Sequence, residues 1–78
     1  MNELDLLNMN CGGQKVIDMT AFSFLQYVAN KLNGVKAFAV EAVELTSLVR
    51  TPPLSKNMHP DRKIEILKKL IKLGITLP

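Results

Sequence analysis

Residues 35–50 have the sequence VKAFAVEAVELTSLVR, and their hydrophobic pattern decides which fold we expect. Apolar side chains recur at intervals of four, three and four residues, as they do along one face of a helix: Phe38, Ala42, Leu45 and Val49. Val40 and Val43 project from nearly the opposite face at about 100° per residue. Alternation with a period of two fails, so the pattern favours a helix over a strand. A helix that is apolar on two sides requires two neighbours within the fold or a partner outside it.

The residues before this stretch predict a second amphipathic helix over residues 20–33. Asp18 or Thr20 can offer a side-chain oxygen to the free amide groups of the first turn. Asn33 followed by Gly34 is typical of a helix C-terminus. Between these limits the apolar side chains gather in one stripe and its flanks, which consist of Ala21, Phe22, Phe24, Leu25, Val28, Ala29 and Leu32.

A third helix is predicted over residues 60–73. Pro60 occupies the first position that proline favours, and Gly74 is typical of a glycine that ends a helix. The loop of residues 51–58 contains two consecutive prolines, which end the central helix. The apolar residues of the third helix cover about half of its circumference, which is wider than the roughly 100° stripe of an ordinary surface helix. They form a main stripe of Ile64, Leu67 and Ile71 and a second stripe of Ile66, Leu70 and Leu73.

Residues 1–19 form an N-terminal segment that we expect to be helical or irregular. Asn2 can cap a short helix that reaches Met9. Gly12 and Gly13 then interrupt the chain, because glycine adopts positive φ without strain. Together with the three main helices, this segment predicts an all-α fold, a small helical bundle that forms one domain over the whole chain.

The composition limits the ways in which so short a chain can be stabilised. At 78 residues a single hydrophobic core only begins to suffice. One cysteine and one histidine exclude an intramolecular disulfide and the usual four-ligand zinc site, so we expect no metal and no cofactor.

The first five residues are acidic and polar where a secretory signal would be basic. Charged residues interrupt every apolar run before it reaches the roughly 18 to 20 residues of a transmembrane helix. These features favour a cytoplasmic protein.

No residue pattern indicates catalysis. Cys11 precedes two glycines, but no base or cation stands near it in the sequence to activate the thiol. The glycine pair also lacks the lysine and the serine or threonine of a phosphate-binding loop. His59 stands directly before Pro60, a position that suits the entry of a helix. We therefore expect a protein that is not an enzyme.

Basic side chains in the third helix support an alternative hypothesis, which is binding to nucleic acid. The net charge is +3 and the isoelectric point is near 9.3. Lysines can neutralise phosphates, but the helix has a single arginine and no aromatic residue for stacking on bases. Peripheral binding to an anionic membrane is a third alternative, for which the helix lacks a tryptophan or phenylalanine anchor. The candidate residues for an anionic partner are Arg62, Lys68, Lys69 and Lys72.

Surplus apolar surface supports the leading hypothesis, which is contact with another protein. Hydrophobic residues make up 47% of the chain and its mean hydropathy is +0.13, which is apolar for a small domain. The N-terminal segment could cover one of the two surplus faces through Leu4, Leu7 and Met9. We expect a small regulator or adaptor that self-associates as a two-fold dimer and binds a protein partner, similar in size and composition to small regulators of bacteria and their viruses. The expected contact residues are Val40, Val43, Ile66, Leu70 and Leu73.

Overall fold

The computed structural model describes residues 2–35 and 39–78. This part of the chain is mostly helical, which confirms the predicted all-α character in its coarse form, and it adds a small two-stranded hairpin. The elements in chain order are α1 (Glu3–Leu7), β1 (Asn10–Cys11), β2 (Gln14–Lys15), the 3-10 helix η1 (Val16–Asp18), α2 (Ala21–Leu32), α3 (Val40–Arg50) and α4 (Pro60–Lys72).

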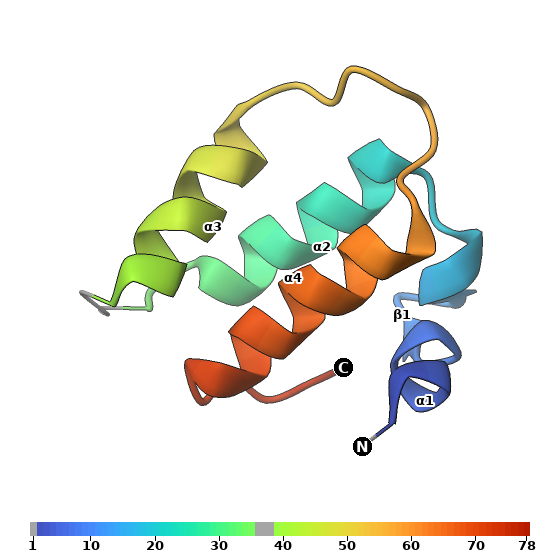
Figure 1. The fold of residues 1–78 in the computed structure, drawn as a ribbon, viewed down its shortest axis with the longest axis horizontal. Coiled ribbons are helices and arrows are strands. Elements are labelled where there is room, and N and C mark those ends of the chain that lie inside the picture. Colours follow the sequence, from blue (N-terminus) through green and yellow to red (C-terminus); the bar gives the residue numbers. More distant parts are fainter. Residues whose placement is uncertain (1, 36–38) are drawn as a thin grey trace.

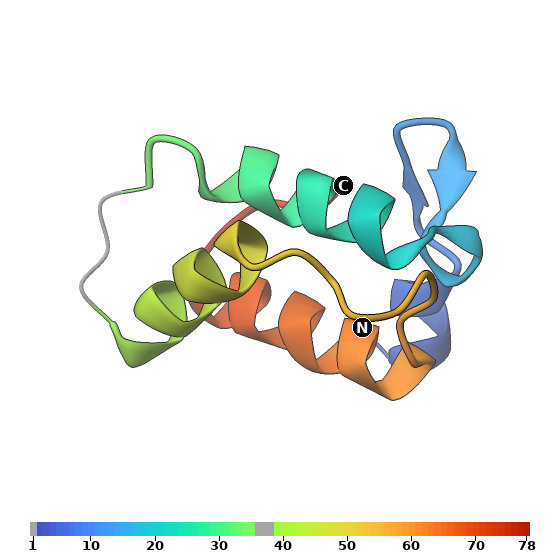
Figure 2. The ribbon, with the colours of Figure 1, turned by 90° about the horizontal axis from the view of Figure 1, so that it is seen from above.

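The helices α2, α3 and α4 pack together, and the N-terminal elements close one end of the group. Helix α3 packs against both α2 and α4, while α1 packs against α4. Figures 1 and 2 show α3 and α1 at opposite ends of the molecule, with α2 and α4 between them. The loop between α3 and α4 runs along the upper edge of the molecule in Figure 1. Helix α4 therefore has a neighbour on each side.

Two of the predicted helices lie where the sequence placed them. In α2 the Thr20 hydroxyl accepts a hydrogen bond from the Ser23 amide at 3.2 Å, and in α4 the His59 Nδ1 accepts one from the Asp61 amide at 3.1 Å. After α4, Gly74 adopts a φ of 81°, and the Gly74 and Ile75 amides donate to carbonyls of the last turn. This is the glycine-ended helix that the sequence predicts.

The central helix is shorter than predicted. We expected a helix over residues 35–50, but α3 begins at Val40, because Val35 is not helical and Ala39 has the extended backbone of an N-cap. The start lacks a side-chain cap, since alanine has no oxygen to offer to the first amides. Phe38, the first member of the predicted stripe, lies outside the described residues. The other members behave as predicted: Ala42 and Leu45 are buried, and Val49 packs partly buried against the core.

The N-terminal segment contains structure that the sequence did not predict. Asn2 caps α1 as expected, with its side-chain oxygen 2.8 Å from the Asp5 amide. After α1, Gly12 and Gly13 both adopt positive φ and form the two-residue turn of a hairpin. We had interpreted the glycine pair as a simple break. The hairpin instead reverses the chain and delivers Val16 to the core, where it is fully buried.

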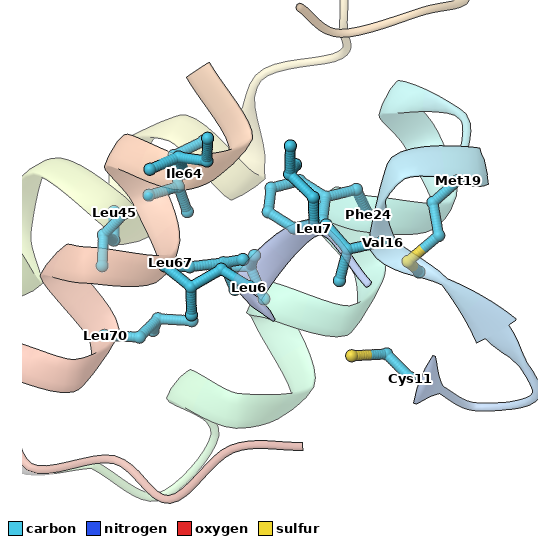
Figure 3. Packing of buried hydrophobic residues seen from close by; sticks show 12 residues of the cluster. Leu6, Leu7, Cys11, Val16, Met19, Phe24, Leu45, Ile64, Leu67 and Leu70 are labelled. Atoms are coloured by element: carbon cyan, nitrogen blue, oxygen red, sulfur yellow. The ribbon is translucent and has the colours of Figure 1, made fainter. Parts of the chain in front are cut away.

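The core contains side chains from the N-terminal elements as well as from α2, α3 and α4. Figure 3 shows the buried cluster, with Leu6 and Leu7 of α1 in contact distance of the side chains from the main helices. The second stripe of α4 belongs to this core, since Ile66 is 1% exposed and Leu70 is 0% exposed. Ile71, which we expected in the main stripe, is instead 44% exposed. The largest fully buried side chains are Phe24, Lys63, Leu6, Leu45, Ile66, Leu67, Leu70, Val16 and Val28.

Lys63 of α4 is a buried cation inside this core. Its side chain is 2% exposed, and its ammonium donates hydrogen bonds to the carbonyls of Val16 at 2.8 Å and Met19 at 2.7 Å. The ammonium also lies 5.9 Å from the centre of the Phe24 ring. A buried charge is tolerated where its hydrogen bonds are satisfied. Lys63 therefore joins α4 to the chain at both ends of η1.

We predict that Lys63→Met destabilises the protein by about 1–3 kcal/mol, the usual cost of leaving a buried polar group without its partner. Methionine keeps most of the side-chain volume but cannot donate to the Met19 carbonyl. Urea unfolding followed by circular dichroism measures the change. The control is Lys68→Met, which removes an exposed ion pair with Glu3 and should leave the unfolding midpoint close to wild type. Equal midpoints for Lys63→Met and wild type would contradict the assigned role of Lys63.

Candidate functional site

The structure divides the predicted contact residues into two groups. Val40 is 68% exposed and Val43 is 61% exposed, both on the outer side of α3. Ile66 and Leu70 lie in the core, so the expectation that they form a surplus surface is wrong for this fold. The reason is that α4 packs against α1 and α3 at once, which buries an apolar arc wider than one neighbour could cover. Leu73 follows α4 and packs partly buried against the same core.

Val43 stands on a ridge between two surface hollows. One hollow, of about 540 Å³, lies between α3 and α4 and is lined in part by Leu48, Ile66 and Lys69. The other, of about 260 Å³, lies towards the end of α2 and is lined in part by Leu32. Val43 lines both. The outer face of α3 thus combines a raised apolar side chain with hollows that side chains of another molecule can fill.

A further apolar groove lies beneath the loop that follows α3, and we name it the proline-loop groove. It consists of one hollow of about 340 Å³ and one of about 190 Å³, which share Leu25, Thr51, Pro52 and Pro53 as walls. Leu54 lines the larger hollow and is fully exposed. Residues 50–55 are similar to a proline-rich docking peptide but lack the P-x-x-P spacing, so their sequence predicts a connector and no groove.

Phe22 lines the smaller hollow of the proline-loop groove and is 62% exposed. We had placed it on the flank of the buried stripe of α2. It falls instead on the solvent side, while Phe24, two residues later, is fully buried. Two aromatic residues on opposite sides of one helix cannot both face the same core.

The basic residues of α4 are largely engaged with carboxylates of neighbouring elements. The closest nitrogen–oxygen distances are 3.1 Å for Lys68 and Glu3 of α1, 2.9 Å for Lys69 and Glu44 of α3, and 2.6 Å for Lys72 and Glu41 of α3. Arg62 has a longer contact of 3.6 Å with Glu65 on its own helix. The three lysines therefore bridge helices within the molecule, and a phosphate would have to compete with these carboxylates.

These ion pairs shift the pKa values of the residues that form them. The hydrogen bond from Lys72 lowers the pKa of the Glu41 carboxyl and, in return, raises the pKa of the Lys72 ammonium. Glu44 raises the pKa of Lys69 in the same way. For Lys63, burial lowers the pKa of the ammonium, and the charge of Asp18 opposes that effect. The pKa shifts of the surface lysines thus stabilise their charged forms, as expected for paired groups.

Cys11 and His59, the two residues considered for catalysis, both occupy structural positions in the fold. Cys11 is 3% exposed at the edge of the core (Figure 3), and His59 caps α4. The hydroxyl of Tyr27 is buried and has no hydrogen-bond partner among the described residues. Its burial, together with the nearby Cys11 thiol, raises the pKa of this phenol. The phenol therefore keeps its proton at neutral pH and cannot serve as a base for the buried thiol.

The described ranges, 2–35 and 39–78, contain no cluster of three histidine, cysteine, aspartate or glutamate side chains that could hold a metal ion. Within the same ranges no helix has the length and apolar character needed to cross a membrane. Comparisons with protein-family models, with curated proteins and with solved structures found no match.

We predict that Lys72→Met returns the pKa of Glu41 towards the ordinary glutamate value. The wild-type carboxyl has a lowered pKa in the folded protein, so its ion pair stabilises the fold above the ordinary pKa and is lost as the pH falls through the lowered one. A pH titration of the side-chain carboxyl by NMR measures this shift. Lys68→Met serves as the control, since Lys68 pairs with Glu3 and should leave the Glu41 titration unchanged. An unchanged pKa of Glu41 in Lys72→Met would contradict the assignment.

Proposed function

We propose that this protein is a non-enzymatic regulator or adaptor that acts by protein contact and self-associates through the outer face of α3. The observation that carries the proposal is the exposure of Val40 and Val43, two large apolar side chains one turn apart on a helix whose other side is buried. Exposed apolar groups that share one helix face are typical of contact surfaces.

A stable dimer would have to bury more surface than Val40 and Val43 provide. Burying one valine contributes about 1.5–3 kcal/mol, so the two valines alone cannot hold a stable pair against the cost of association. A standard interface covers about 800 Å² on each partner, which is about a sixth of the 5114 Å² surface of this chain. An interface of that size would have to include the hollows on both sides of Val43.

A two-fold arrangement suits such a surface. In a two-fold dimer the same patch occurs on both partners, so a ridge on one copy can enter a hollow on the other and receive the same contact in return. Val43 supplies the ridge, and the hollow between α3 and α4 supplies the complement. The proposal therefore uses features that a single chain already carries.

The nucleic-acid hypothesis stays a prediction with less support. Lys68, Lys69 and Lys72 would have to leave Glu3, Glu44 and Glu41 before they could bind phosphates. Counterion release favours binding only where cations are free to neutralise phosphate. We also infer a cytoplasmic location, because the single cysteine is a buried free thiol, which suits a reducing compartment.

We predict that Val43→Asp abolishes self-association. A carboxylate on the ridge would lose its hydration in the interface without gaining a partner, while the monomer should tolerate it on the surface. Light scattering over a range of protein and salt concentrations measures the mass, and the wild type should form a dimer that persists at high salt. The matched control is Leu4→Asp, which places the same charge at a residue 69% exposed on α1. A wild-type protein that remains monomeric at every concentration would refute the proposal.

A further inference from the structure

The proline-loop groove adjoins the hollows beside Val43, which Arg62 and Arg50 also line, but it excludes Val43 itself and has its own charge pattern. Arg62 lines its larger hollow, and Arg50 lines its smaller hollow. The walls that the two hollows share are largely apolar, and each hollow has one arginine in its lining. Among the described residues, no carboxylate lines either hollow.

Both guanidinium groups are available to an incoming anion. Arg50 makes no ion pair within the described part of the chain, and it closes α3 at the protein surface. The side chain of Arg62 is 48% exposed, and its distance of 3.6 Å to Glu65 is longer than that of the other α4 pairs with α1 and α3. An arginine in this state can form bidentate hydrogen bonds with a carboxylate.

Two helix N-termini add to the positive potential of the groove. The larger hollow is lined by Ala21, the first residue of α2, and by Met58 and Arg62, which flank the start of α4. The positive ends of both helix dipoles therefore border the same apolar hollow. This arrangement favours a ligand that is apolar in the middle and negative beside it.

We propose that the proline-loop groove docks a peptide segment of a partner protein in which an apolar side chain is flanked by acidic residues. The apolar side chain would occupy the larger hollow against Leu25 and Leu54, and the carboxylates would pair with Arg50 and Arg62. Leu54 is fully exposed beside this hollow, so an apolar side chain bound there would remove Leu54 from water. This surface does not include Val40 or Val43, so the inference goes beyond the proposed self-association.

The test is a binding titration of the full chain with a short fluorescent peptide that contains leucine and phenylalanine separated by glutamates. Fluorescence anisotropy should show saturable binding that weakens as salt is added. The same peptide with lysine in place of glutamate should not bind. Arg50→Gln and Arg62→Gln should each weaken binding about tenfold, the effect of losing one good charge contact. The control is Lys15→Gln, which removes the same charge from a residue outside the groove.

Further variants separate this proposal from self-association and from other occupants. Val43→Asp should keep full affinity for the peptide, so a failure of the dimer proposal leaves this result intact. Binding that is equal for wild type and both arginine variants would overturn the docking site. Loss of self-association in Arg50→Gln and Arg62→Gln, without any binding of the peptide, would also overturn it and assign the groove to a second copy. Binding of anionic lipid vesicles in place of the peptide would overturn it in favour of a membrane surface.

Discussion

The buried ammonium of Lys63 is the contact on which the described part of the N-terminal segment, residues 2–19, depends. The 3-10 helix η1 leaves carbonyls pointing into the molecule, and Lys63 supplies the donors that satisfy those of Val16 and Met19. Without Lys63 the Met19 carbonyl would lose this donor, whereas the Val16 carbonyl would still accept from the Met19 amide at 3.1 Å. The hairpin and α1 precede η1 directly, so their position against α4 follows from the same anchor. Burial lowers the pKa of Lys63 because it disfavours the charged ammonium, and the hydrogen bonds to the carbonyls offset this cost.

Anchoring the N-terminal segment changes which apolar residues remain on the surface. With α1 on one side of α4 and α3 on the other, a wide arc of α4 becomes interior, including Ile66 and Leu70. Helix α3 packs against α2 and α4, but neither covers its outer face, so Val40 and Val43 stay exposed. Exposed apolar side chains therefore remain on α3 and on the loop that follows it, and also at Leu4, Phe22 and Ile71.

Local signals in the sequence predicted the helices well, and long-range contacts explain what they missed. Caps such as Asn2, Thr20 and His59 act within three residues, so sequence alone could place α1, α2 and α4. The choice between Ile71 and Ile66 as core residues depends on where α1 and α3 sit, which periodicity does not encode. The same holds for Lys63: it stands in a run of lysines and arginine, and only tertiary packing separates it from its solvated neighbours.

The ion pairs between α4 and its neighbours decide where positive charge remains available. Lys68, Lys69 and Lys72 face carboxylates from α1 and α3, so the part of the sequence with most basic residues presents little free charge. Arg50 and Arg62 retain theirs beside the proline-loop groove, where the surface is also apolar. Charge alone would suit any polyanion, whereas charge beside an apolar hollow discriminates against nucleic acid, whose phosphates bring no apolar group to bury. The location of Arg50 and of Arg62, which has only a long contact with Glu65, therefore supports the proposed protein partner over a nucleic acid, for a reason that net charge could not reveal.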